Sequence, residues 1–285
     1  MNDIHIVIMA GGVGSRLFPL STPERPKQFI DLLDCGKTLI QLTYERFLKV
    51  SPDARFWVVT SARYIHFVNE HLPDIPAEQI LAEPEARNTA PCIAYACWKI
   101  RQKHPTANIV VTPSDAYVPD CDAFAVTMRT ALSFTGTRHA IVCVGIKPTS
   151  PHTGYGYIHA SGGDGVVKVS EFKEKPSAEV AERYLAEGGY YWNAGIFVWN
   201  VRTIEEELRT HAPQICAVMD ELVPALYTPR EEAALARLFP ACEKISIDYA
   251  VMEKSPYVYM IPGHWDWSDL GSFEAIEAIT GKKLK

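Results

Sequence analysis

The stretch HIVIMAGGVGSR, from His5 to Arg16, decides the fold of this chain. Its first half is an apolar run of strand length, and its second half is a turn with glycine at positions 11, 12 and 14. Glycines directly after a buried strand let backbone N–H groups approach a phosphate closely. Arg16 lies in this turn and Lys27 follows one loop later, so both can bring positive charge to the same place. This part of the sequence therefore predicts a strand that ends in a nucleotide or phosphate site.

The glycine loop matches neither of the two common nucleotide-binding fingerprints. A dinucleotide pattern that started at Gly12 would need glycine where Leu17 stands, and the Gly-Lys-Ser/Thr of the Walker pattern is absent. An ordinary strand-to-helix turn with solvated basic residues is the structural alternative. The basic pair, Arg16 and Lys27, is what favours ligand binding.

The composition is that of an ordinary globular protein of 285 residues, 47% of them hydrophobic and 22% charged. The formal charge of −6 gives no basic field, so neither nucleic acid nor an anionic membrane is an expected partner. The seven cysteines are scattered, with no C-x-x-C pair and no zinc-like grouping, which indicates reduced thiols. The sequence has no signal-peptide pattern and no apolar run near the roughly 20 residues that span a bilayer. We expect a cytoplasmic protein.

Apolar runs of strand length alternate with helix-period segments in the first half of the chain, which is typical of a parallel α/β sheet. Strands are expected at about 4–9, 55–60, 79–82, 108–111 and 139–145. Helices are expected at 38–50, 62–71, 89–103 and 123–134, with caps such as Asn88 and Asp122. This pattern predicts a Rossmann-like α/β fold with a mixed, mostly parallel sheet flanked by helices, whose ligands bind beyond the carboxyl ends of the strands.

The second half of the chain has a different pattern of predicted strands and helices. Two antiparallel strands are expected at about 154–158 and 166–172, followed by a helix at 177–187 and a strand at 194–199. Helical segments over 201–238 and a last helix at 271–279 complete the prediction. We expect one domain over residues 1–285, in which about 1–145 form a nucleotide-binding half and about 146–285 a smaller antiparallel part.

Two aspartates stand at positions suited to a hard cation. Asp115 directly follows a buried strand, and Mg²⁺ takes one or two protein carboxylates and fills its other positions with phosphate and water oxygens. Asp269 is the second candidate, with capping of the helix that follows as its structural alternative. The D-x-D pair of Asp120 and Asp122 precedes a helix too, so we interpret it as a cap and give it no metal role.

Polar groups at the end of another predicted strand suit a sugar phosphate. In Phe-Lys-Glu-Lys-Pro at 172–176, alternation places Lys173 and Lys175 on one side and Glu174 on the other. A lysine there can bind phosphate while Glu174 accepts hydrogen bonds from hydroxyls, although a solvated strand end explains the charges equally well. Asn193 lies in an aromatic setting that suits a sugar, with a turn amide as the alternative.

In type and order, these motifs together resemble the sugar-1-phosphate nucleotidylyltransferases, and within them the mannose-1-phosphate guanylyltransferases. The matching stretches span about residues 4–275 and are 11–17, 19–21, 26–29, 83–84, 87–91, 113–115, 153–158, 172–176, 192–197, 246–254 and 267–272. Pro-Lys-Gln-Phe at 26–29, Arg-Asn-Thr-Ala-Pro at 87–91 and Ser-Ile-Asp-Tyr-Ala at 246–250 point to the guanylyl branch rather than the thymidylyl or uridylyl branches.

The resemblance implies a GT-A-like nucleotidyltransferase that transfers GMP from GTP to mannose 1-phosphate, with GDP-mannose and pyrophosphate as products and Mg²⁺ as cofactor. The attacking phosphate oxygen is already anionic, so no general base is expected. The implied catalytic residues are Arg16 and Lys27, and the implied metal ligands are Asp115 and Asp269. The implied nucleotide-binding residues are Gly11, Gly12, Gly14, Ser15, Glu83, Asn88 and Thr89. The implied sugar-phosphate-binding residues are Gly154, Glu174, Lys175, Asn193 and Asp248.

Three residues depart from the family pattern. Ala116 stands where histidine is common, and Leu270 and Phe273 stand where valine and tryptophan are frequent, so rate or substrate choice could differ. Relatives often continue into a β-helix or isomerase domain, and neither is expected before the chain ends at Lys285. A homodimer is compatible with the resemblance.

Three other functions stay open at this point. The chain could transfer GMP to another sugar 1-phosphate, such as a heptose or fucose derivative. It could be a non-catalytic regulatory homologue that binds nucleotide sugars, although such a protein would be free to lose Arg16, Lys27, Asp115 or Asp269, and all four are present. A metal-dependent glycosyltransferase is the third, disfavoured because its D-x-D candidate is interpreted as a cap.

Overall fold

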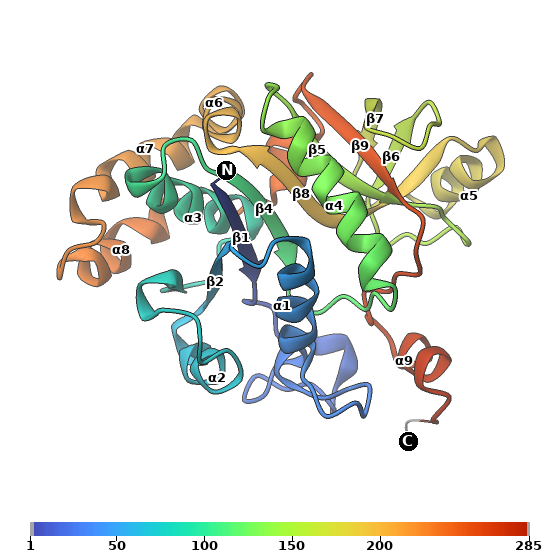
Figure 1. Cartoon of the computed structure of the whole chain (residues 1–285), viewed down its shortest axis with the longest axis horizontal. Helices are drawn as coiled ribbons and strands as arrows, with labels where there is room; N and C mark the ends of the chain where they lie inside the picture. The colour runs from blue at the N-terminus through green and yellow to red at the C-terminus, as the bar shows by residue number, and fades with distance from the viewer. Residues whose placement is uncertain (1–2, 284–285) are drawn as a thin grey trace.

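The computed structural model of the chain describes residues 3–283. Within them the strands form one nine-stranded sheet in the order β3-β2-β1-β4-β8-β5-β9-β7-β6, with helices on both faces (Figure 1). The strands are β1 (Ile4–Met9), β2 (Arg55–Ser61), β3 (Ile80–Glu83), β4 (Asn108–Pro113), β5 (Ile141–Ile146), β6 (Tyr157–Ala160), β7 (Val167–Lys173), β8 (Tyr190–Asn200) and β9 (Val258–Gly263). The helices are α1 (Leu39–Val50), α2 (Ile65–His71), α3 (Thr89–Lys103), α4 (Cys121–Thr135), α5 (Ala178–Glu187), α6 (Val201–His211), α7 (Pro213–Leu222), α8 (Glu231–Leu238) and α9 (Phe273–Thr280).

The four strands β3, β2, β1 and β4 form the parallel part of the sheet. β1 lies inside it, and Ile6, Val7 and Ile8 have no exposed surface because helices cover both faces. The carboxyl ends of these strands meet at one edge, directly before the glycine loop that follows β1 and the turn that follows β4. The predicted α/β architecture is confirmed here.

The other half of the sheet closes on itself. β8 pairs antiparallel with β4 and β5 and also with β6, so β8, β5, β9, β7 and β6 form a ring. A mostly parallel sheet was expected, but outside β3-β2-β1-β4 only β5 and β9 run parallel. The reason is β8: its eleven residues are long enough to pair with the parallel part at one end and with the ring at the other.

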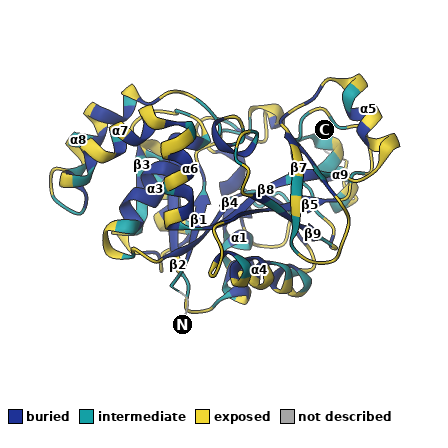
Figure 2. Cartoon of the chain, turned by 90° about the horizontal axis from the view of Figure 1, so that it is seen from above, coloured by how far each residue is buried: buried dark blue, intermediate teal, exposed yellow. Residues whose placement is uncertain are grey.

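Two hydrophobic cores lie on opposite faces of the sheet, because alternate strand residues point to opposite sides. Val7 and Val111 pack in one core with Trp98 of α3 and residues of α6 and α7. Ile6 and Val110 pack in the other core with helices α1 and α4. Figure 2 shows the resulting layers, with buried strands between helices whose outer faces are exposed.

Several predicted boundaries shift and one strand was missed. β9 was not predicted, because its short apolar run, from Val258 to Ile261, ends at a proline. β6 begins only at Tyr157, so the segment 154–156 lies outside the strand. α3 has the predicted cap Asn88, which accepts from the Thr89 backbone N–H. α4 is capped by Asp120 rather than Asp122, in agreement with the expected capping role of that pair.

The cysteines and the helices agree with two expectations from the sequence, namely reduced thiols and no apolar run long enough to span a bilayer. All seven cysteines are free thiols, and most are buried. In the described part of the chain, each helix is too short or too polar to cross a bilayer.

Candidate functional site

The predicted site residues converge on one cavity of about 550 Å³ at the carboxyl edge of β1, β3 and β4. Its wall includes every residue that the sequence analysis assigned to catalysis, metal, nucleotide or sugar phosphate except two. The two exceptions are Gly14 and Ser15, which the structure does not bring to the cavity. A cavity beyond the carboxyl ends of parallel strands is where open α/β sheets bind ligands.

The glycine loop is held in place by Gln28. The Gln28 side-chain amide donates to the carbonyl oxygens of Ala10 and Gly12, at 2.9 and 3.0 Å. Gly14 has a different role, since its φ is +67° and a Cβ there would lie 2.9 Å from the Cβ of Lys27. Gly14 therefore permits the close packing of the loop on Lys27, while Gly11 and Gly12 face the cavity.

Glu83 has one buried side-chain oxygen without a hydrogen-bond partner in the part of the chain that the structure describes. It ends β3, is 8% exposed and lines the cavity, yet its Oε1 has no hydrogen-bond donor among the described residues. Burial raises its pKa to about 8. A buried polar atom left unpaired costs about 1–3 kcal/mol, so a native fold keeps one where a ligand supplies the missing bond.

Lys27 joins the two predicted metal ligands. Its ammonium lies 2.8 Å from Asp115 Oδ2 and donates to the backbone carbonyl of Asp269 at 2.6 Å. Only 5% of Lys27 is exposed, whereas the Arg16 side chain is largely exposed and lies 3.6 Å from Asp269 Oδ2. Two cations and two carboxylates thus share one wall of the cavity.

Asp269 does not cap the following helix, because the N-cap of α9 is Ser272. Its Oδ1 accepts from the Tyr155 hydroxyl at 2.7 Å and from the Gly271 backbone N–H at 3.0 Å. Burial, together with the charge of Asp269, raises the pKa of Tyr155 above its ordinary value, so this hydroxyl remains a donor. The structural alternative that the sequence allowed for Asp269 is therefore removed.

Another part of the cavity lining holds the predicted sugar-phosphate groups. Asn193 Nδ2 donates to Asp248 Oδ1 at 3.1 Å, and Lys175 Nζ lies 3.1 Å from Glu174 Oε1. Burial, and then the charge of Glu174, raise the pKa of Asp248 to about 7. At Gly156 a Cβ would lie 2.5 Å from Glu174 Oε2, so glycine lets this carboxylate approach the backbone in its present position.

Strand alternation gave the wrong side for Lys175. Glu174 and Lys175 both line the cavity, whereas Lys173 points elsewhere and lies 3.9 Å from Glu253. The physical reason is the backbone: β7 ends at Lys173, and Lys175 adopts a left-handed φ of 47°. Alternation holds only while the strand continues.

The carboxylates of Asp115 and Asp269 fit a hard cation in their chemistry. Both present oxygen ligands to a cavity that a phosphate could enter, and oxygen is what Mg²⁺ prefers. Between residues 3 and 283, each aspartate also retains an oxygen that accepts no hydrogen bond from a neutral donor, namely Oδ2 of Asp115 near Lys27 and Oδ2 of Asp269 near Arg16. Displacement of these cations toward a phosphate would leave both oxygens for a metal.

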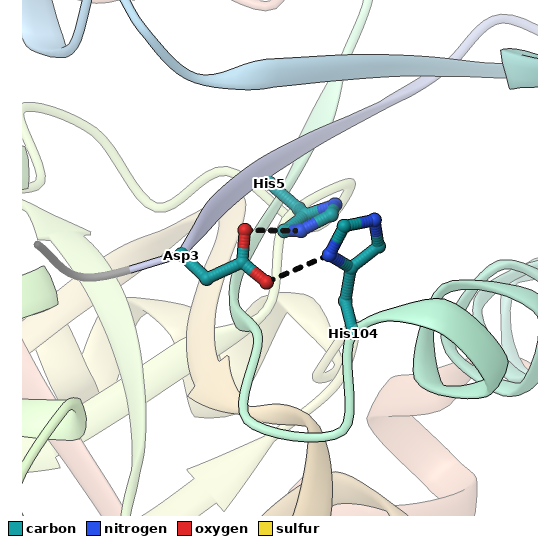
Figure 3. Close-up of side chains that lie close together, drawn as sticks. All are labelled: Asp3, His5 and His104. Atoms are coloured by element: carbon teal, nitrogen blue, oxygen red, sulfur yellow. Dashed lines mark hydrogen bonds and ion pairs between the residues drawn. The ribbon is translucent and has the colours of Figure 1, made fainter.

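A second polar cluster lies at the amino end of β1 and consists of Asp3, His5 and His104 (Figure 3). Asp3 Oδ2 lies 2.8 Å from His104 Nδ1, and Asp3 Oδ1 lies 3.2 Å from His5 Nε2. The Trp57 indole N–H donates to His5 Nδ1 at 2.9 Å, which fixes the proton of the neutral ring on Nε2. Arg55 also pairs with Asp3, at 2.7 Å. Because these groups already bind one another, we assign no metal to this cluster.

Sequence reasoning missed three residues of the site. Tyr155 and Trp267 line the cavity, and Gln28 holds the glycine loop from behind. All three lie inside the motifs that carried the family resemblance, so the motifs contained the signal. Their roles depend on contacts with distant parts of the chain, which no local pattern reveals.

Fold and site together place a cavity lined by basic and acidic side chains at the carboxyl edge of a mixed α/β sheet. The profile of the Nucleotidyl transferase family matches residues 5–285, and the chain belongs to this family. The xanthan biosynthesis protein XanB of Xanthomonas campestris pv. campestris is 38% identical over 284 residues, covering 97% of this chain and 59% of that protein. The mannose-1-phosphate guanylyltransferase of Escherichia coli K12 is 35% identical over 294 residues, covering 98% of this chain and 60% of that protein.

A solved structure is similar over nearly the whole of this chain. The Thermus thermophilus protein described as a mannose-1-phosphate geranyltransferase superimposes with a TM-score of 0.87 at 32% identity, covering 98% of this chain and 80% of that one. The chain spans about three fifths of the length of the two curated relatives above, which cover nearly all of it.

Proposed function

We propose that this chain transfers GMP from GTP to mannose 1-phosphate, giving GDP-mannose and pyrophosphate. The observation that carries the proposal is the single cavity, which joins a nucleotide-type wall at the glycine loop to a sugar-type wall at Glu174, Asn193 and Asp248. The Escherichia coli relative named above as a mannose-1-phosphate guanylyltransferase supports the choice of substrates.

Glu83 would select guanine on the nucleotide wall. Guanine presents two neighbouring N–H donors, which an ionised carboxylate accepts, whereas adenine presents an acceptor at the corresponding ring position. Glu83 lines this cavity, and its Oε1 is buried with no donor among residues 3–283. Gly11, Gly12, Asn88 and Thr89 would line the rest of the nucleoside site, and Gly14 and Ser15 would support its loop.

The reaction needs positioning and charge rather than a base. An oxygen of mannose 1-phosphate attacks the α-phosphorus of GTP, the bond from that phosphorus to the α,β-bridging oxygen breaks, and pyrophosphate leaves with the electron pair. Lys27 and Arg16 would bind the triphosphate and stabilise the negative charge that develops on the departing pyrophosphate. Lys175 would neutralise the phosphate of the sugar.

Asp115 and Asp269 would hold Mg²⁺, which when bound would neutralise phosphate charge in the transition state. Glu174, Asn193, Asp248 and Gly154 would contact sugar hydroxyls. In this proposal about 1–145 form the nucleotide half and about 146–285 the sugar-phosphate half of one cytoplasmic catalytic domain.

A pyrophosphate-release assay tests the proposal with a panel of nucleoside triphosphates and sugar 1-phosphates, including heptose and fucose derivatives. Release should require GTP, mannose 1-phosphate and Mg²⁺ together. Equal release without a sugar phosphate, or with every sugar phosphate in the panel, would contradict the assignment. In Glu83→Gln the preference for GTP over ATP should fall by at least about tenfold, since loss of a charged hydrogen bond is worth about 1.5–3 kcal/mol.

A further inference from the structure

Tyr155 is the one residue whose side-chain hydroxyl donates a hydrogen bond to either predicted metal ligand in the described part of the chain. It donates to Asp269 Oδ1 at 2.7 Å, across 114 positions of sequence. The sequence analysis gave Tyr155 no role, although it lies between the two glycines of Gly154-Tyr155-Gly156.

Aromatic contacts fix the Tyr155 ring. The His152 ring stacks on it with centroids 3.9 Å apart, and Trp192 and Trp267 meet it edge to face at 5.2 Å each. A ring held on three sides cannot swing its hydroxyl away at little cost, so the hydrogen bond to Asp269 is built into the wall of the cavity.

The two oxygens of Asp269 are thereby made unequal. Oδ1 accepts from both Tyr155 and the Gly271 backbone N–H, whereas Oδ2 lies toward Arg16. With Oδ1 held by two donors, rotation of the carboxylate about its Cβ–Cγ bond is restricted and Oδ2 is the oxygen left for a cation. Donors behind a metal-binding carboxylate typically set its orientation and affinity.

We propose that Tyr155 is a positioning residue that orients Asp269 for the cation, and that it links cation binding to the 154–156 segment on the sugar-phosphate wall. The inference rests on the metal assignment within the proposed function. The link follows from the chain itself: Gly156 accepts from the Asn193 backbone N–H at 2.8 Å, so the segment that holds Tyr155 is tied to a predicted sugar ligand.

The test compares four proteins by their affinity for Mn²⁺, read as free Mn²⁺ by electron paramagnetic resonance without any substrate. They are the wild type, Tyr155→Phe, Asp269→Asn and the matched control Tyr157→Phe. Tyr157 is buried two residues further on, and its hydroxyl donates to the His152 carbonyl at 3.0 Å rather than to the site. Each variant is first checked for native circular dichroism and cooperative melting.

Tyr155→Phe should bind Mn²⁺ about tenfold more weakly, the lower end of what loss of such a supporting donor costs. Tyr157→Phe should match the wild type, and Asp269→Asn should lose the site. In turnover assays Tyr155→Phe should need about tenfold more Mg²⁺ for half-maximal rate, with its KM for GTP unchanged at saturating Mg²⁺.

Two different results would overturn the inference, and they distinguish the role of Tyr155 from the metal assignment. Wild-type affinity in Tyr155→Phe together with loss of binding in Asp269→Asn refutes the role of Tyr155 and leaves the metal assignment standing. Wild-type affinity in Asp269→Asn refutes the metal assignment itself, and the role of Tyr155 falls with it.

Discussion

The polar groups at the two ends of β1 differ in how they are paired. At the amino end, Asp3 lies between His5, His104 and Arg55, and His5 is held further by Trp57. At the carboxyl end, Arg16, Lys27 and Lys175 also lie beside carboxylates, but the buried Glu83 side chain has one oxygen with no donor in the described structure.

The comparison separates polar groups that stabilise the fold from polar groups that serve a ligand. At the amino end, Asp3 already lies within ion-pair distance of His5, His104 and Arg55, so we expect these groups to need no ligand. A buried carboxylate without a donor lowers stability, so it persists where function requires it. The comparison predicts that changes at the carboxyl end alter activity, whereas changes at the amino end alter stability.

The largest expected effect is on activity, at Lys27. Lys27→Met removes a cation from the triphosphate and also from Asp115 and the Asp269 carbonyl. Turnover should fall about a hundredfold, equal to ~2.7 kcal/mol in the barrier. Steady-state kcat is the measurement, and Lys173→Met is the matched control because Lys173 points away from the cavity. Unchanged kcat in Lys27→Met would contradict the expectation that the groups at the carboxyl end serve activity.

The next effect is on stability, at His5. Burial lowers the pKa of His5 from 6.5 to about 4, so between these values the unfolded state binds more protons than the folded state. Stability contributed by neutral His5 is therefore present at pH 7.5 and is lost as pH falls, by about 2 kcal/mol at pH 5.

Urea denaturation at both pH values measures this loss. His5→Asn is the reference, because its side-chain oxygen can still accept from Trp57 but does not titrate. The wild type should lose about 2 kcal/mol more than His5→Asn between pH 7.5 and pH 5, while kcat of the two proteins at pH 7.5 should agree. An equal pH dependence would show that His5 is not held neutral.

The smallest expected effect is at Glu83, and it is the number of protons released when GTP binds. With a pKa of about 8, free Glu83 is mostly protonated at pH 7. Guanine N–H donors favour the ionised form, so GTP binding should release up to about one proton from this group. Titration calorimetry in two buffers of different ionisation enthalpy measures the release, with Glu83→Gln as reference. If both proteins release the same number of protons, Glu83 does not accept from the base.

The sequence predicted what is local and missed what depends on distant contacts. The glycine loop, Asp115 and the Asn88 cap could be predicted because strand, turn and cap chemistry act within a few residues. The Tyr155 bond to Asp269 could not, because it joins residues 114 positions apart. Lys175 was placed on the wrong side because a left-handed backbone ended the alternation.

For the fold too, the sequence predicted the local elements better than the contacts between distant ones. The strands of the parallel part were found near their true positions, because each is a buried apolar run followed by a helix. The ring was not foreseen as a closed unit, since its closure depends on the pairing of β8 with β6 and on β9, which arrives from the far end of the chain.

β8 has a consequence for the recombination of halves between relatives. Its residues 197–200 pair with β4, whereas residues 190–192 pair with β6. A chimaera that took everything after β5 from a relative would carry a foreign strand into the centre of the resident sheet. There the relative's residues in place of Phe197 and Trp199 would have to pack in a core selected with a different strand. A replacement that stops before Phe197 would exchange Glu174 and Asn193 but keep Asp248, and it would leave the pairing of β8 with β4 intact.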